Sequence, residues 1–125
     1  MIDYAKFPGL AGVYLEDSYV LEISEAPGRV VFSLDAVLTP ESPAYRAPRL
    51  GEQYCYAGAR LVFPDVDRVE WIDRTENHLS DAAGDKDLGN IDVLNFAGDS
   101  IVVEGDWGRV RIHGSTPYVE LEGGR

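Results

Sequence analysis

Aspartates crowd the stretch from residue 81 to residue 92, and their spacing raises the question of a cation site. Calcium in proteins takes about six to eight oxygen ligands, and a loop can wrap the ion when carboxylates alternate along the chain beside a glycine. Asp85 and Asp87 have this alternate spacing, and Asn90 adds a neutral oxygen donor. The aspartates and glycines of the stretch are Asp81, Gly84, Asp85, Asp87, Gly89 and Asp92.

The pattern of a calcium-binding EF-hand loop fails after its first two ligands. Counted from Asp85, the third ligand position holds Gly89, the glycine position holds Asn90, and the closing glutamate position holds Phe96. Aspartate and asparagine also cap turns by bonding their own backbone, and glycine supplies positive φ. We therefore expect no metal and no cofactor, although Asp85 and Asp87 are the best metal candidates. The same two carboxylates are predicted to contact an arginine or lysine of a partner.

Nucleophilic catalysis requires a nucleophile beside a base, which is most often a histidine. The chain has two histidines, His78 in the acidic stretch and His113 on the polar face of a predicted strand. Its one cysteine, Cys55, is flanked by two tyrosines, and free cysteine usually behaves as a small buried hydrophobic residue. The nucleotide-binding, serine-hydrolase and zinc-protease motifs are absent. The sequence therefore predicts no catalytic residue and favours a protein that is not an enzyme.

Two other segments have residue types that favour binding. Residues 39–52 carry three prolines and no apolar period, and a loop of this length is often functional. Tyrosine and arginine are over-represented at binding hot spots, so Tyr45, Arg46 and Arg49 are predicted partner contacts. Trp107, in a tight turn, would be a further anchor if it were exposed. We favour the alternative, in which its ring folds back over the edge of the core and its indole N–H finds an acceptor.

The charge of the chain restricts its partners. The net charge is -11, from 22 acidic and 11 basic residues. Nucleic-acid binders need a positive footprint, so we expect no nucleic-acid partner and no anionic membrane partner. An acidic field instead favours a basic protein, whose association it accelerates. The protein itself is expected to be a monomer or a homodimer.

The compartment is predicted from what the sequence does not contain. The N-terminus has no continuous apolar region of a secretory signal, and no apolar run approaches the roughly 20 residues of a membrane-spanning helix. A single cysteine agrees with a reducing compartment. We therefore expect a cytoplasmic protein. Its preference for arginine over lysine, with much Ala, Gly and Asp, is typical of bacterial sequences of high GC content.

Period-two alternation and β-branched or aromatic residues dominate the chain, and this pattern predicts an all-β domain over residues 1–125. The long loops are expected at 39–52 and 74–90. On the strand from 29 to 38, alternate apolar residues predict the core face. The other expected elements are a strand at 18–24 joined to 29–38 by a type II turn, a hairpin within 52–63, a strand at 67–73, and a C-terminal four-stranded meander at 91–96, 100–105, 109–113 and 118–122.

About eight strands with short turns predict a single-domain antiparallel β-sandwich or partly open β-barrel. For function, the sequence favours a small acidic interaction domain that binds a basic protein, as an inhibitor or immunity-type protein would. The alternative is a ligand- or metal-binding β-domain, followed by a small β-barrel enzyme.

Overall fold

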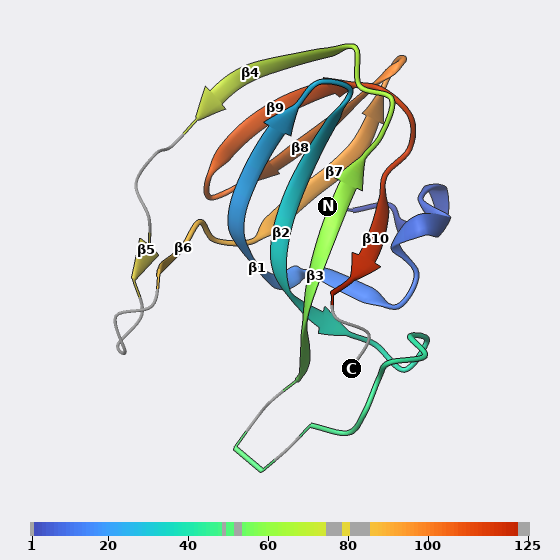
Figure 1. Ribbon diagram of the computed structural model, residues 1–125, viewed down its shortest axis with the longest axis vertical. Helices are drawn as coiled ribbons and strands as arrows, with labels where there is room; N and C mark the ends of the chain where they lie inside the picture. Colours follow the sequence, from blue (N-terminus) through green and yellow to red (C-terminus); the bar gives the residue numbers. More distant parts are fainter. Residues whose placement is uncertain (1, 49, 52–53, 75–78, 81–85, 123–125) are drawn as a thin grey trace.

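Eight of the ten strands in the described residues form two antiparallel sheets of four strands each, stacked as a β-sandwich and not closed into one barrel. The computed structural model describes residues 2–48, 50–51, 54–74, 79–80 and 86–122. Figure 1 looks onto the first sheet, with the second sheet behind it. In spatial order the first sheet comprises β1 (Val13–Ala26), β2 (Arg29–Leu38), β3 (Cys55–Phe63) and β10 (Tyr118–Leu121). The second comprises β4 (Arg68–Arg74), β9 (Gly108–His113), β8 (Ser100–Gly105) and β7 (Ile91–Ala97). The all-β sandwich prediction is confirmed.

The hairpin of β1 and β2 follows directly from the local sequence. Gly28, at the predicted turn, has φ of +82°, a conformation that glycine adopts without steric cost. The alternate apolar residues of β2 are all buried in the core, as predicted: Val30, Phe32, Leu34, Ala36 and Leu38. Residues on the two inner faces of such a sandwich interdigitate to form its core.

Two predicted pairings are wrong. The stretch from Cys55 to Phe63 does not turn at Ala57 and Gly58 but runs as one strand, β3, paired along its length with β2. The C-terminal meander has three strands, β7, β8 and β9, because the fourth, β10, pairs with β3 in the other sheet. β4 takes its place beside β9. Alternation predicts which face a residue occupies, but it does not determine which strand lies alongside.

β1 is interrupted by a bulge between Tyr14 and Tyr19, where its residues outnumber those of β2. The Ser18 side chain replaces backbone hydrogen bonds that β1 and β2 do not make at the bulge. Its hydroxyl accepts a hydrogen bond from the Val37 N–H at 2.8 Å and donates one to the Tyr14 carbonyl at 2.8 Å. Tyr4, in the segment before β1, also contacts the bulge: its hydroxyl accepts a hydrogen bond from the Leu15 N–H at 2.8 Å. Without Ser18, the Val37 N–H would be buried without an acceptor.

The N-terminal segment lies against the sandwich. It contains two short 3-10 turns, η1 (Tyr4–Lys6) and η2 (Pro8–Leu10). Phe7 is buried and stacks on Phe96 of β7, with ring centroids 4.8 Å apart. Among the described residues, no helix has the length and apolar character needed to cross a membrane.

The acidic stretch is only partly described. It includes a small ladder of β5 (Leu79–Ser80) and β6 (Lys86–Asp87), which projects to one side in Figure 1. After β6 the chain pairs with β1: the Leu88 N–H donates to the Val20 carbonyl at 2.8 Å, and the Val20 N–H donates to the Gly89 carbonyl at 2.7 Å. Part of the predicted loop therefore lies hydrogen-bonded to Val20 of β1.

Candidate partner-binding surface

The outer face of the first sheet gathers tyrosines and carboxylates. Across the strands, Val37 lies in register between Tyr14 of β1 and Tyr56 of β3. In the next row Asp35 lies between Tyr19 and Gly58 in the same way. Tyr14 and Tyr19 are 39% and 43% exposed. We call Tyr14, Tyr19, Tyr54, Tyr56, Asp17 and Asp35 the tyrosine face.

The rings of the tyrosine face contact one another in a chain. Tyr19 stacks on Tyr56 with centroids 6.4 Å apart, and Tyr56 meets Tyr54 edge-on at 6.0 Å. Both distances fall in the range of favourable aromatic pairs. Glu122 packs close to Gly58 in the same row: a Cβ at position 58 would lie only 3.3 Å from a carboxylate oxygen of Glu122. The rings are therefore held in place by each other and by the sheet.

A hollow of about 220 Å³ lies where the tyrosine face meets the loop that begins at Thr39 after β2, which we call the Pro-rich loop. Figure 1 shows this loop, between β2 and β3, extending beyond the sandwich. The root of the loop is anchored, because the Thr39 N–H donates to the Gly12 carbonyl at 2.9 Å. Within the loop, the Tyr45 N–H donates to the Ser42 carbonyl at 3.1 Å and closes a turn. The lining residues are Tyr14, Val37, Leu38, Thr39, Pro40, Tyr45, Pro48, Tyr54 and Cys55.

The carboxylates give this surface its electrostatic character. A hydrogen bond to Asp17 raises the pKa of the Tyr54 phenol above its ordinary value. Burial, followed by the neighbouring Tyr19 and Asp35, raises the pKa of Tyr56. Both phenols therefore stay protonated and uncharged at neutral pH. On the remainder of this outer face Arg60 is paired with Glu120, so its positive charge is already compensated.

The predicted binding residues have different outcomes. Tyr45 lines the hollow, and the guanidinium of Arg46 donates to the Ala47 carbonyl at 3.3 Å. Arg49 and Asp85 lie outside the described residues, and Asp87 is described only as part of β6, without its side chain.

Trp107 is not an exposed anchor. It is 1% exposed, packs edge-on against Phe32 and Trp71, and donates its indole N–H to the Asn90 carbonyl at 2.9 Å. The favoured arrangement at the core is confirmed, and the assignment of Trp107 as a partner contact is wrong because its ring fills the space between the sheets.

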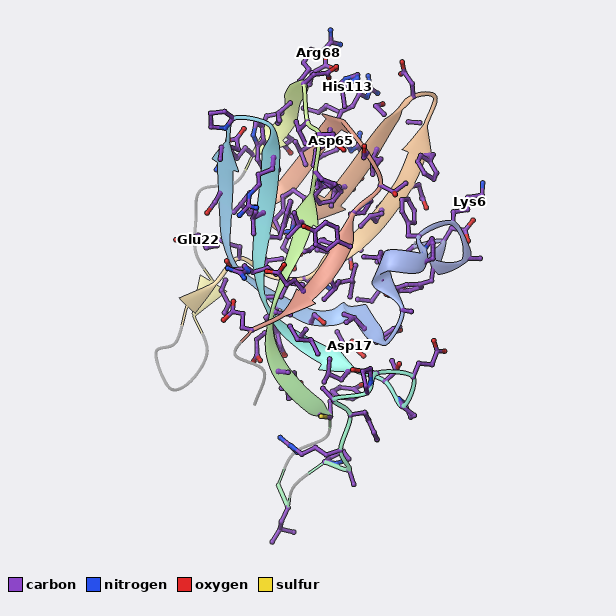
Figure 2. All side chains as sticks on the ribbon, turned by 45° about the vertical axis from the view of Figure 1, so that its right-hand side comes forward. Lys6, Asp17, Glu22, Asp65, Arg68 and His113 are labelled. Atoms are coloured by element: carbon purple, nitrogen blue, oxygen red, sulfur yellow. The ribbon has the colours of Figure 1, made fainter. Side chains whose placement is uncertain are left out.

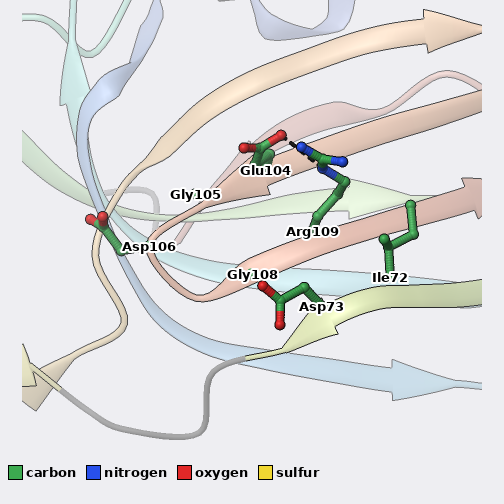
Figure 3. Close-up of a pocket in the computed structure, with 7 residues that line it drawn as sticks. All are labelled: Ile72, Asp73, Glu104, Gly105, Asp106, Gly108 and Arg109. Atoms are coloured by element: carbon green, nitrogen blue, oxygen red, sulfur yellow. Dashed lines mark hydrogen bonds and ion pairs between the residues drawn. The ribbon is translucent and has the colours of Figure 1, made fainter.

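A second hollow, of about 460 Å³, lies near the turn between β8 and β9. Figure 3 shows the side chains of Glu104 and Arg109 pointing toward one another from the neighbouring strands β8 and β9, and they pair at 2.9 Å. Asp73 and Asp106 also line this hollow. Its arginine is already neutralised by a partner on the same sheet, so this hollow has less capacity to recognise a charged ligand than the tyrosine face has.

His113 lies close to the carboxylate of Glu70, which is an arrangement that the alternative of a small β-barrel enzyme would require. Its Nε2 lies 2.6 Å from Glu70 Oε1, and Glu70 also accepts from Arg68 at 2.9 Å. These hydrogen bonds, first from His113 and then from Arg68, hold the pKa of Glu70 below its ordinary value. Figure 2 places Arg68 and His113 together at the end of the molecule opposite the Pro-rich loop. Neither hollow described above includes them, so the group has the character of a surface ion-pair network.

Four tyrosines of this surface were not predicted as binding residues: Tyr14, Tyr19, Tyr54 and Tyr56. Tyr14 and Tyr19 are five residues apart, so a regular strand would place them on opposite faces. The bulge changes this relation and turns both outward. Tyr54 and Tyr56 share a face by their spacing, but only the pairing of β3 with β2 places them beside β1 residues.

Comparisons with protein-family models, curated proteins and solved structures find no match to this chain.

Proposed function

We propose that the protein is a small, acidic, non-catalytic interaction domain that binds a basic protein through its tyrosine face, in the manner of an inhibitor or immunity-type protein. The observation that carries this proposal is the juxtaposition of four tyrosines with Asp17 and Asp35 on one outer sheet face. Tyrosine provides a large contact area with few rotatable bonds, and it is enriched at binding hot spots.

The sheet supports this role because it fixes the rings before a partner arrives. Tyr19 and Tyr56 stack on one another across β2, so little side-chain freedom is left to lose on binding. Ordering a rotamer-rich side chain at an interface costs about 0.5–1.5 kcal/mol, and that cost is reduced when the side chain is already held. The tyrosine face therefore has the preorganisation that a tight interface needs.

The charge supports a basic partner in particular. With a net charge of -11 the protein attracts positively charged proteins over distances of the order of the Debye length, about 10 Å at 0.1 M salt. The carboxylates of the tyrosine face then lie where the partner's cations arrive. Such complementarity raises the association rate more than it raises the affinity, so salt should weaken binding chiefly by slowing association.

Affinity capture tests the proposal. The tagged full-length chain and a Tyr19→Ala/Tyr56→Ala variant are used with extract from cells that encode the protein, at low and at high salt. The expected result is a stoichiometric basic protein that the wild type retains, that the variant loses and that high salt releases. A partner retained equally by the variant, or indifferent to salt, contradicts the proposal. Tyr118→Ala, on β10 of the same sheet, is the matched control and should retain the partner.

A further inference from the structure

The hollow between the Pro-rich loop and the tyrosine face has the size of a site for one side chain. Its volume of about 220 Å³ is below the roughly 300–1,000 Å³ of pockets that hold drug-sized ligands and cofactors. Three of its lining residues are tyrosines, from three segments: Tyr14 of β1, Tyr45 of the loop and Tyr54 directly before β3. Aromatic rings on several sides of a small hollow suit a flat or compact guest.

The charges around the hollow favour a cationic guest. No lysine or arginine is among the described residues that line it. Asp17 lies beside it, because it accepts a hydrogen bond from the Tyr54 hydroxyl. Asp35 continues the acidic surface past Tyr56. A cation over a tyrosine ring is attracted by the ring quadrupole, and the nearby carboxylates add to that attraction.

Among protein cations, the guanidinium group of arginine fits these features better than the ammonium group of lysine. Guanidinium is planar, stacks on aromatic rings and is weakly hydrated, so it loses less on leaving water for a hollow lined by tyrosine, proline and valine. It also offers N–H groups in a fixed fork, which suits a carboxylate such as Asp17 at the rim. Lysine is a strongly hydrated point charge and gains less from stacking.

We propose that this hollow binds one arginine side chain of the basic partner, with the guanidinium stacked on Tyr45 and directed toward Asp17. The inference rests on the proposed function, since it names the group by which the partner is recognised. Arginine insertion makes the loop residue Tyr45 part of the binding surface.

A peptide titration followed by NMR tests the inference on the isotope-labelled full chain. The probes are three short capped peptides that differ at one position, which is arginine, lysine or citrulline. Citrulline has nearly the shape of arginine but no charge. The arginine peptide should shift the ring signals of Tyr14, Tyr45 and Tyr54 in a saturable manner, the lysine peptide should bind more weakly, and the citrulline peptide should not bind. Equal shifts with citrulline, or no saturable shift with arginine, overturn the inference.

Variants separate a role of the ring from a role in folding. Tyr45→Ala should weaken binding of the arginine peptide by about two- to thirtyfold, the range of one cation–π contact. Tyr45→Phe keeps the ring and should retain most of the affinity, and Tyr118→Ala should retain all of it. A Tyr45→Phe variant that binds as poorly as Tyr45→Ala would contradict stacking as the basis of recognition. Thermal melts of each variant verify that the chain is folded.

The same variants distinguish this inference from the proposed function. In the capture experiment, loss of the partner with Tyr19→Ala/Tyr56→Ala and its full retention with Tyr45→Ala would mean that the face binds a partner without the arginine site. In that outcome only the arginine inference is wrong. Retention of the partner by both variants would contradict the proposed function itself. Loss of the partner with both variants, together with arginine-specific peptide binding, supports both.

Discussion

The indole of Trp107 is the largest fully buried side chain of the described residues, and its one polar atom has one acceptor. Trp107→Phe would leave the Asn90 carbonyl without this donor and a void beside Phe32. We expect a loss of about 2–4 kcal/mol in the free energy of unfolding, measured by urea denaturation.

Trp71→Phe is the matched control for this substitution. The Trp71 indole is only partly buried, and its N–H contact to Glu25 is long, at 3.4 Å, and exposed. Phenylalanine also keeps a ring face for the Arg74 guanidinium, which lies 4.2 Å from the Trp71 ring centroid. The cost should stay below about 1 kcal/mol. Equal losses for the two tryptophans would mean that burial of Trp107 contributes nothing particular to stability.

Glu70 gives a pH prediction at the same scale. Its pKa in the folded protein lies below the ordinary 4.5, because His113 and then Arg68 donate to its carboxylate. Because the folded-state pKa of Glu70 is lowered, the stabilisation that these hydrogen bonds give to the folded protein is fully present above the unfolded-state pKa of Glu70. It is lost as pH falls through the folded-state value. Urea denaturation from neutral pH down to about pH 3 should therefore show wild type and Glu70→Gln converging at the acid end.

A carboxyl titration by NMR provides the independent measurement for Glu70. In a His113→Ala variant the pKa of Glu70 should rise toward 4.5, and it should stay slightly below because Arg68 still donates. An unchanged Glu70 pKa in His113→Ala would show that the 2.6 Å contact does not exist in solution.

At the scale of elements, the β1 bulge depends on Ser18, which is 2% exposed. Ser18→Ala would remove the acceptor of the buried Val37 N–H, and an unsatisfied buried donor costs about 1–3 kcal/mol. Thermal and urea denaturation should both show this loss. Ser24→Ala, on the exposed end of the same strand, is the control and should change stability by less than about 0.5 kcal/mol. A neutral Ser18→Ala would mean that the bulge finds another acceptor, such as water.

The bulge also separates what the sequence predicts from what it does not. The core face of β2, the turn at Gly28 and the burial of Trp107 all follow from short-range patterns, and the structure confirms them. Which strands pair depends on packing between residues far apart in the sequence. No local sequence pattern therefore indicated that β10 joins the first sheet and that β4 joins the second. Arg109 of β9 pairs with Glu104 of β8, its neighbour in the second sheet, at 2.9 Å. Prediction of the tyrosine face would have needed both the bulge in β1 and the pairing of β3 with β2.

At the scale of the whole molecule, the net charge of -11 makes salt act on folding and on binding in opposite directions. Self-repulsion destabilises a compact, highly charged protein, so screening should stabilise it. Raising NaCl from about 0.01 M to about 1 M shortens the Debye length from about 30 Å to about 3 Å. At neutral pH the melting temperature should rise by about 3–6 °C, which corresponds to roughly 1 kcal/mol.

The same addition of salt should release the proposed basic partner, because it screens the attraction between opposite charges. A pH near the pI of about 4.4 provides the control for the melting temperature, since the net charge is then close to zero and the effect of salt should disappear. If salt raised the melting temperature equally at both pH values, preferential exclusion of the salt would explain the result, and self-repulsion would not. If salt strengthened partner binding, the contact would be governed by apolar burial, and the carboxylates of the tyrosine face would have no part in attracting the partner.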